Sequence, residues 1–574
     1  MENVSLVIDN REVTVPKGTT ILNAAKKLGI EIPTLCHLDE INEIGACRVC
    51  VVEVEGSYNL EPSCIYKVRE GMVVKTNSAR ARNARKINTE LLLSDHAHDC
   101  LVCDRNNNCE LQSIASLLDI REYRFEGEKS SSKIDESSPS IYRDSTKCIN
   151  CRKCIAICEK IQGVSALGAA ERGFETVVVP AQNNLIADVN CVTCGQCINV
   201  CPTGALSEVS HINRVVEALS DENMHVVVQT APAVRVALGE SFGIEVGTNV
   251  QGKMVTALRQ LGFDKVFDTD FTADLTIMEE GTELINRIKG GGVLPLITSC
   301  SPGWIKYVEH NYPDLFPHLS TCKSPQQMFG VLAKTFYAQK YDIDPAKIYS
   351  VSIMPCTAKK FEITRPGMDS SGYQDVDAVL TTRELANLIK SAGIDLKTLP
   401  DQEYDAPLGL STGAGVIFGA TGGVMEAALR TAYEILTEET LEKLEFEELR
   451  GIEGVKYASV KIGEMDVNVA VAHSLLKAKE IMDKLRNKEL EDIHFIEVMA
   501  CPGGCIGGGG QPRSKDPDII EKRMQGVYNA DKSMELRKSH ENPAVKELYE
   551  EFLGEPNSHV AHKLLHTFYI PRKK

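Results

Sequence analysis

Twenty cysteines dominate the chemistry that this 574-residue sequence could perform. Many of them recur at C-x2-C spacing, which is typical of metal sites rather than of disulfide bridges, and a reducing cytosol also disfavours disulfides. Zinc sites use two such pairs, whereas runs of three C-x2 steps favour iron–sulfur clusters, because soft thiolates bind iron well. The spacing therefore predicts a protein built around iron–sulfur clusters.

Two cysteine runs carry the strongest signal. Residues 148–158 read CINCRKCIAIC and residues 191–201 read CVTCGQCINVC, which is C-x2-C-x2-C-x3-C twice. In two-cluster ferredoxins the fourth cysteine of each run serves the other cluster. We therefore predict two [4Fe–4S] clusters, one held by Cys148, Cys151, Cys154 and Cys201 and the other by Cys158, Cys191, Cys194 and Cys197.

A third group lies near the N-terminus, with the spacing C-x10-C-x2-C-x13-C. Plant-type [2Fe–2S] ferredoxins also place a tight C-x2-C pair on loops of a small α+β fold, although their usual C-x4-C is replaced here by C-x10-C. We predict a [2Fe–2S] cluster at this group, with zinc as the alternative. Its ligands would be Cys36, Cys47, Cys50 and Cys64.

Residues 96–109, HAHDCLVCDRNNNC, supply three further cysteines, Cys100, Cys103 and Cys109. A fourth ligand is missing, and an imidazole can provide it. By spacing alone His96 and His98 are both candidates, either could be a surface histidine, and zinc is an alternative to iron.

The C-terminal region carries the remaining metal-ligand candidates in three segments, TSCSPGW, MPCTAKKFE and EVMACPGGCIGGGGQP. Between Cys501 and Cys505, two glycines let the backbone fold tightly and bring both sulfurs to one site. The run Gly507 to Gly510 predicts something bulky against the backbone. A phosphate-binding P-loop is disfavoured because no Lys-Ser/Thr follows.

The expected elements place these motifs on loops. Residues 1–80 read as a hairpin, a helix and further strands, residues 81–125 as helical, and the Ser-rich stretch 126–140 as a linker. From residue 223 onward apolar strands (HVVVQTAP, VLPLITSC, IYSVSIMPC, FIEVMAC) alternate with helical patterns, as in a mainly parallel sheet. Three of these strands end in or just before a cysteine, and parallel sheets bind ligands at the carboxyl ends of their strands.

We therefore predict an α/β catalytic domain with mainly parallel sheets, preceded by α+β ferredoxin-like iron–sulfur domains. The predicted boundaries are 1–80 for the [2Fe–2S] domain, 81–125 for the His/Cys3 [4Fe–4S] domain, 126–210 for the two-cluster domain and 211–574 for the catalytic domain.

The composition limits the classes of partner that the protein is expected to bind. The net charge of −17 argues against nucleic acid, whose phosphates are bound by basic patches. No run of 18 apolar residues occurs, and the N-terminus lacks a basic-then-apolar signal pattern, so we expect no membrane contact and a cytoplasmic location.

The three C-terminal segments together resemble the signature loops of the [FeFe]-hydrogenases, and the N-terminal cluster order resembles the multi-cluster clostridial type. The likeness covers nearly the whole chain. It implies one [2Fe–2S] cluster, three accessory [4Fe–4S] clusters and an H-cluster, which is a [4Fe–4S] cubane joined through a cysteine to a di-iron unit with CO, cyanide and a bridging dithiolate. The implied reaction joins two protons and two electrons into hydrogen, and runs in reverse.

The resemblance also implies roles for residues. Cys356, Cys501 and Cys505 would hold the cubane, with Cys505 bridging to the di-iron unit. Lys359 would donate a charged hydrogen bond to a cyanide, and His96 rather than His98 would complete the 96–109 site. The residues expected to wall the pocket are Ala231, Pro232, Gln326, Met354 and Met499.

Cys300 and Ser301 depart from the family pattern, which has two adjacent cysteines at this place. By register Cys300 is the proton-relay cysteine and Ser301 occupies the position of a cubane ligand. Three interpretations stay open: the loop shifts by one residue so that Cys300 is the ligand, Ser301 binds iron as an alkoxide, or the serine impairs cluster assembly, whether the change is natural or engineered.

Glu280, Glu283 and Arg287 lie at i, i+3 and i+7, so they share one face of a predicted helix. Taken alone, this row indicates a solvated face. The resemblance implies instead a buried proton path to Cys300, completed by Ser320.

The predicted function is reversible proton reduction with electrons from ferredoxin or a similar carrier, after maturation proteins have supplied the di-iron unit. Two rivals stay open. One is the hydrogenase subunit of an NAD/ferredoxin electron-bifurcating complex, and the other is a non-catalytic iron–sulfur assembly or sensor relative.

Overall fold

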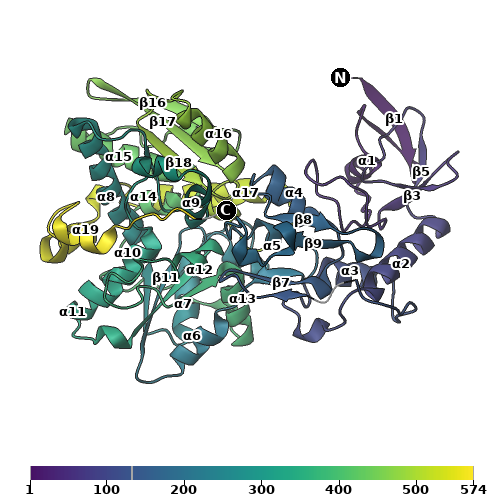
Figure 1. The fold of residues 1–574 in the computed structure, drawn as a ribbon, viewed down its shortest axis with the longest axis horizontal. Coiled ribbons are helices and arrows are strands. Elements are labelled where there is room, and N and C mark those ends of the chain that lie inside the picture. The colour runs from purple at the N-terminus through teal and green to yellow at the C-terminus, as the bar shows by residue number, and fades with distance from the viewer. Residues whose placement is uncertain (1, 131–132, 573–574) are drawn as a thin grey trace. The chain divides into compact units, whose positions relative to one another are not determined.

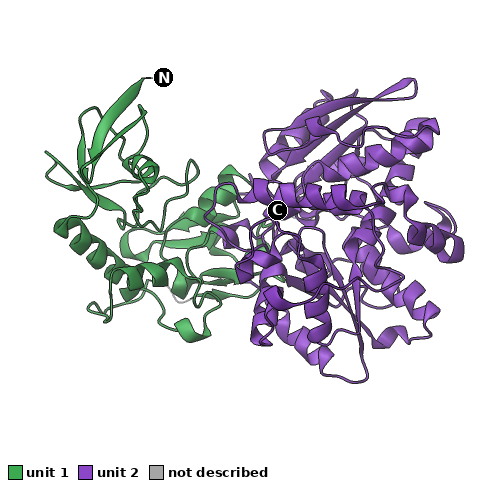
Figure 2. Ribbon diagram, turned by 180° about the vertical axis from the view of Figure 1, so that it is seen from behind, with its two compact units in different colours: residues 1–161, 165–191, 200–207 green, residues 162–164, 192–199, 208–574 purple. Residues whose placement is uncertain are grey.

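The computed structural model describes residues 2–130 and 133–572, and the chain divides into two compact units (Figure 2). Unit 1 comprises residues 1–161, 165–191 and 200–207, and unit 2 comprises residues 162–164, 192–199 and 208–574. Among the described residues, no helix combines the length and the apolar composition that a membrane span requires.

Unit 1 opens with a five-stranded sheet in the order β2-β1-β5-β3-β4. The first two strands form the expected hairpin, whose turn residues Asp9 and Asn10 have φ angles of +46° and +62°, as a tight two-residue turn requires. Thr20 caps the first helix by accepting from the Asn23 N–H. The strands and helix are β1 (Asn3–Ile8), β2 (Arg11–Pro16), α1 (Ile21–Lys27), β3 (Val51–Val54), β4 (Leu60–Pro62) and β5 (Val73–Lys75).

After this sheet, unit 1 continues with two helices and then with short strands and one further helix. Its elements are α2 (Ala79–Ser94), α3 (Glu110–Leu117), β6 (Ile134–Asp135), β7 (Ile141–Asp144), α4 (Lys153–Lys160), β8 (Leu167–Ala170) and β9 (Val177–Pro180), and β10 (Leu206–Glu208) pairs with β7 where the chain passes into unit 2.

The prediction that residues 126–140 form a linker is wrong in its second half, because β6 lies there and pairs antiparallel with β7. Asp135 of that strand is buried and accepts from the backbone N–H groups of Ser137 and Ile186. A two-residue strand between serines has too little apolar pattern to be recognised. Residues 131 and 132 of the same stretch lie outside the described residues.

Unit 2 contains two sheets that are parallel except for one edge hairpin (Figure 1). The first has the order β12-β11-β14-β15 with every pairing parallel, and the second has the order β13-β18-β17-β16 with an antiparallel β16–β17 pair. The predicted mainly parallel α/β architecture is confirmed. The strands are β11 (His225–Thr230), β12 (Lys265–Asp268), β13 (Leu296–Ile297), β14 (Ile348–Met354), β15 (Ala378–Thr381), β16 (Lys456–Ile462), β17 (Met465–His473) and β18 (Phe495–Met499).

Helices cover both faces of the first sheet. Val226 and Val228 of β11 belong to one hydrophobic core, and Val227 between them belongs to another, as alternation along a strand requires. The helices of unit 2 are α5 (Gln196–Val200), which ends at the unit boundary, α6 (Ile212–Leu219), α7 (Gln251–Gln260), α8 (Thr269–Gly290), α9 (Pro302–Asn311), α10 (Pro325–Leu332), α11 (Ala338–Lys340), α12 (Ala358–Glu362), α13 (Thr382–Ser391), α14 (Gly413–Val416), α15 (Gly423–Thr437), α16 (Leu475–Arg486), α17 (Ile519–Ser533), α18 (Pro543–Leu548) and α19 (His559–Leu565).

Phe329 of α10 is fully buried, and its ring centroid lies 5.6 Å from that of Phe267. Phe329→Ala should lower the free energy of unfolding of unit 2 by about 3–5 kcal/mol, because it removes a core side chain and leaves a cavity. The control Tyr373→Ala, at a residue 43% exposed, should change it by less than about 0.5 kcal/mol. Urea unfolding followed by the fluorescence of Trp304, the single tryptophan, measures both; equal effects would contradict this account of the core.

Candidate active site

One cavity of unit 2 collects residues that follow the carboxyl ends of three parallel strands. Ala231 and Pro232 follow β11, Cys356 follows β14 and Cys501 follows β18. The cavity has an empty volume of about 810 Å³. The predicted wall residues Gln326, Met354 and Met499 also line it, so the structure brings the three C-terminal segments together.

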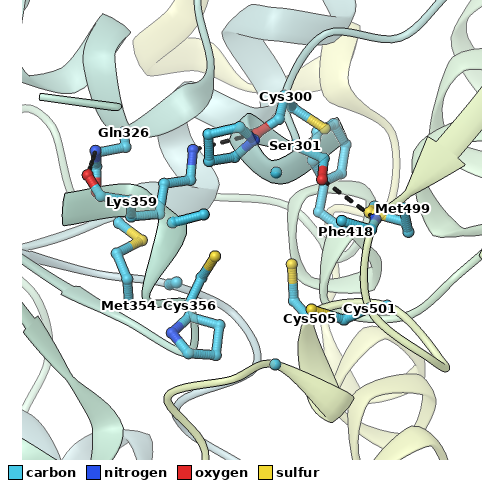
Figure 3. Close-up of a pocket in the computed structure, with 18 of the residues that line it drawn as sticks. Cys300, Ser301, Gln326, Met354, Cys356, Lys359, Phe418, Met499, Cys501 and Cys505 are labelled. Carbon is cyan, nitrogen blue, oxygen red and sulfur yellow. Dashed lines mark hydrogen bonds between the residues drawn. The ribbon is translucent and has the colours of Figure 1, made fainter. Parts of the chain in front are cut away.

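Three thiols, those of Cys356, Cys501 and Cys505, point into this cavity (Figure 3). Burial raises the pKa of each thiol, that of Cys505 to about 12, and the neighbouring Cys356 adds to the rise at the other two. Buried thiols of this kind become thiolates where a metal replaces the proton. The donor set therefore fits an iron–sulfur cubane, and Ser301 also lines the cavity.

The glycine run is crowded by the protein's own backbone. A Cβ on Gly508 would lie 2.2 Å from the Pro355 carbonyl oxygen, and one on Gly509 would lie 2.1 Å from that of Cys194. The bulky group predicted to lie against these glycines is therefore, at least in part, the backbone of neighbouring segments. Gly508 also lines the cavity. These contacts clamp the Cys505 loop against the segments that carry Cys356 and Cys194.

Ser301 and Cys300 direct their side chains differently. Ser301 precedes α9, and its Oγ accepts from the N–H of Ala500 at 3.3 Å, beside the loop of Cys501. The Cys300 thiol packs against a hydrophobic core, and its pKa is raised by burial and then by the Glu280 carboxylate. Both residues line the cavity, and the Ser301 hydroxyl beside the Cys501 loop agrees with the register in which Ser301 is next to the cubane position.

Lys359 is held in place by two acceptors. Its Nζ donates to the Cys300 carbonyl at 3.2 Å and to Glu362 Oε2 at 2.9 Å, and Gln326 Nε2 donates to the same carboxylate oxygen. Sequence reasoning missed Glu362, although its i,i+3 spacing from Lys359 on one helix was a signal. The Gln326 Oε1 atom is buried and makes no hydrogen bond to any described residue.

Three residues of the predicted proton path, Arg287, Glu283 and Ser320, are joined by hydrogen bonds beside α8. Arg287 Nη2 donates to Glu283 Oε1 at 2.6 Å, and the Ser320 hydroxyl donates to Glu283 Oε2 at 3.0 Å. Glu280 is buried, and its pKa is raised to about 8 by burial and, secondarily, by Glu283. The solvated-face interpretation of this row is therefore wrong, because tertiary packing covers Glu280.

The four N-terminal cysteines of unit 1 are all buried and form two close pairs. The sulfurs of Cys50 and Cys64 lie 3.3 Å apart, and Cys36 interacts with Cys47. Four converging thiols suit either the predicted [2Fe–2S] cluster or zinc by geometry alone.

The structure separates the two candidate histidines. His98 is exposed, stacks on Tyr123 and has its Nε2 2.9 Å from the Leu93 carbonyl. His96 is buried, and its Nδ1 has no hydrogen-bond partner among the described residues. Burial lowers the pKa of His96 to about 4, which keeps the neutral imidazole that binds metals. It lines a cavity with Cys100 and Cys109, so the geometry favours His96 as the ligand.

One ferredoxin-type set also meets in a single cavity, of about 410 Å³, lined by Cys148, Cys151, Cys154 and Cys201. For the other set, Cys158 and Cys191 belong to unit 1, and Cys194 and Cys197 belong to unit 2. Cys194 additionally lines the large cavity of unit 2. A predicted accessory ligand therefore stands at the wall of the candidate active site.

Comparison with known families matches most of the chain. Residues 224–509 match the iron only hydrogenase large subunit, C-terminal domain, and residues 517–572 match the iron hydrogenase small subunit. Residues 1–79 match a 2Fe-2S iron-sulfur cluster binding domain, residues 85–124 the NADH-ubiquinone oxidoreductase-G iron-sulfur binding region, and residues 147–205 a 4Fe-4S dicluster domain.

Individual proteins give the same result. The chain is 53% identical to the NADP-reducing hydrogenase subunit HndD of Solidesulfovibrio fructosivorans over the full length of both. It is 42% identical to iron hydrogenase 1 of Clostridium pasteurianum, with 98% of this chain and 99% of that protein covered. A solved apo [FeFe]-hydrogenase HydA1 from Chlamydomonas reinhardtii is 43% identical with a TM-score of 0.58, covering 64% of this chain and all of that one.

Gly508→Ala should reduce the iron bound in the large cavity at least about tenfold, because a Cβ there collides with fixed backbone and shifts the Cys505 loop. Gly290→Ala is the control, since Gly290 has no atom within 4 Å of an added Cβ. Iron content and cluster spectra of the two purified variants measure the effect. Normal iron content in Gly508→Ala would contradict the claim that these close backbone contacts fix the Cys505 loop.

Proposed function

The chain belongs to the iron-only, or [FeFe]-, hydrogenase family, and from that membership we propose that it reversibly reduces protons to hydrogen with electrons from ferredoxin or a similar carrier. As an oxidoreductase of this family it uses an H-cluster together with 2Fe–2S and 4Fe–4S clusters. The observation that carries the proposal is the meeting of Cys356, Cys501 and Cys505 in one buried cavity beside Lys359.

Those three cysteines would hold the cubane, with Cys505 bridging to the di-iron unit and Ser301 at the fourth position. When bound, the H-cluster combines protons and electrons into hydrogen and splits hydrogen in the reverse direction. The chain's own part is to bind the cluster, to keep water out, and to bring protons and electrons to it.

Lys359 supplies the fixed positive charge of the cavity. Glu362 and the Cys300 carbonyl orient its ammonium group, which would donate to a cyanide ligand. Met354 and Met499, both buried, offer soft uncharged packing beside the cluster. Ala231, Pro232 and Gln326 would complete the wall of the cavity.

Protons would move along the row of groups from Arg287 to Cys300. Arg287 and Glu283 are partly exposed, with side chains 15% and 14% accessible, so they form the outer end. The Ser320 hydroxyl links Glu283 to the buried Glu280, and Glu280 would pass the proton to the Cys300 thiol. Cys300 is the last carrier before the cluster in this order.

Electrons would arrive through four accessory clusters, one [2Fe–2S] at Cys36, Cys47, Cys50 and Cys64 and three [4Fe–4S] at the remaining sets. Such clusters transfer single electrons without binding substrate. We place the protein in the cytoplasm, where a reducing thiol pool keeps cysteines available as ligands, and maturation proteins would insert the di-iron unit.

A second candidate function has a specific observation in its favour. The relative HndD is named as a subunit of an NADP-reducing hydrogenase, and the likeness covers its full length. This chain would then be the hydrogenase subunit of a complex whose partner subunits bind flavin and nicotinamide. Co-purification of the untagged protein from its own cells with a flavoprotein would favour this second function, and isolation alone with ferredoxin-dependent activity would favour the first. The assembly or sensor alternative is weaker, because the cavity keeps Lys359, Met354 and Met499.

Ser301→Cys should raise cubane occupancy and hydrogen evolution together by about tenfold, because a thiolate is a better iron ligand than a hydroxyl. Ser299→Cys, two residues away at a serine that donates to the Cys322 carbonyl, should give no gain. Iron content and hydrogen evolution from reduced ferredoxin are the measurements. An unchanged Ser301→Cys protein would show that position 301 does not limit the cluster.

Glu280→Gln should slow hydrogen evolution by about 100-fold or more, because an amide cannot relay a proton, while the infrared bands of CO and cyanide stay in place. In the unmodified protein, Glu280 loses its proton as the pH rises through its pKa of about 8, so the rate should fall above that pH. A pH–rate profile over this range measures the effect. A flat alkaline limb, or an active Glu280→Gln protein, would contradict the assigned path.

A further inference from the structure

Arg105 in unit 1 is a buried cation without a protein counter-charge. Its side chain is 2% exposed, and its Nε and Nη1 atoms make no hydrogen bond to any residue that the structure describes. Other buried arginines have partners: Arg235 pairs with Asp268 and Asp270, and Arg430 pairs with Glu426 and Asp531. Buried charges are ordinarily paired, because removing an ion from water costs several kcal/mol.

The position of Arg105 is at the His96 site. It follows Cys103 by two residues, and Gly204 lies against both, since a Cβ on Gly204 would be 2.6 Å from Cys103 Sγ and 3.6 Å from Arg105 Cγ. The guanidinium charge also reaches Cys109, where it counteracts the rise in the thiol pKa that burial causes. Arg105 thus lies close to two of the three predicted thiolate ligands.

Lys147, the other cation beside Gly204, is already neutralised. Its Nζ lies 3.2 Å from Asp99 and 3.1 Å from Asp144. Asp99 and Asp144 are therefore engaged by Lys147, and no described carboxylate forms an ion pair with Arg105. The thiolates of Cys103 and Cys109, with the group that they bind, are a source of counter-charge close to Arg105.

A cluster at this site supplies the missing charge. Three thiolates and a neutral imidazole give a [4Fe–4S] cluster a net negative charge, and each electron that it accepts from a donor adds one more without a bound proton. A fixed positive charge at low dielectric favours the more negative state, and local charge is among the factors that set cluster potentials.

We propose that Arg105 is a positioning residue for the His96/Cys100/Cys103/Cys109 cluster, where its guanidinium balances the thiolate charge and raises the reduction potential. This proposal rests on the ligand set proposed above. It assigns to Arg105 a role in electron entry rather than in hydrogen chemistry.

The test is a redox titration of the full-length protein with its accessory clusters loaded, followed by electron paramagnetic resonance. Coupling of the reduced cluster to the His96 nitrogen identifies the relevant signal. Arg105→Gln should lower the equilibrium constant for one-electron reduction about tenfold, which is about 59 mV toward more negative potential. Arg105→Lys keeps the charge and should shift the potential by less than half as much.

Arg121→Gln is the matched control, because Arg121 lines the cavity of His96, Cys100 and Cys109 but is exposed and paired with Asp119 at 2.6 Å. Solvent screening should leave its potential unchanged. Equal potentials for Arg105→Gln and the unmodified protein would overturn the proposal. If Arg105→Gln loses the cluster, retention of cluster and potential in Arg105→Lys supports it, and loss in both variants overturns it in favour of a purely structural role.

Absence of nitrogen coupling in the unmodified protein would instead show that the ligand set is wrong and would remove the basis of this proposal. Hydrogen evolution from an artificial donor at the catalytic domain would then still test the proposed function separately.

Discussion

The free-energy cost of burying thiolates is the constraint on which the cysteine sites of this protein depend. Cys356, Cys501 and Cys505 stand in a cavity whose surroundings raise their pKa values, so without a metal they are neutral thiols. Iron reverses that preference, because it replaces the protons and neutralises the charge. The same reasoning applies to Cys148, Cys151 and Cys154 of unit 1, because burial also raises the pKa values of these thiols. Folding and cluster binding are therefore coupled, since the loops gain their intended partners only when iron is present.

Helix α8 connects two requirements of the site. Its length of 22 residues lets one element present Glu280 to the interior and Arg287 toward the surface. Glu280 is kept protonated near neutral pH by burial, and Cys300 beside it is likewise kept as a thiol. The low dielectric that makes thiolates dependent on iron thus also prepares the proton carriers. Opening the cavity to water would weaken both effects together.

Sequence reasoning succeeded where the signal was local. Cysteine spacing predicted which residues meet in the cavity of Cys148, and strand patterns placed Cys356 and Cys501 just beyond β14 and β18. It failed where the cause was long-range. The crowding of Gly509 by the Cys194 carbonyl joins residues more than three hundred positions apart, and neither the burial of Glu280 nor the orientation of Ser301 can be derived from a helix pattern. Glu362 was missed because its role appears only once Lys359 and Gln326 are seen to share it.

The central claim is that the converging cysteines of unit 2 hold iron. Anomalous X-ray diffraction at the iron edge, from crystals of the matured protein grown without oxygen, tests it most directly. The account predicts strong iron peaks within bonding distance of the sulfurs of Cys356, Cys501 and Cys505, with the fourth cubane corner toward Ser301. Iron peaks confined to unit 1, with that cavity free of iron in a fully matured sample, would contradict it.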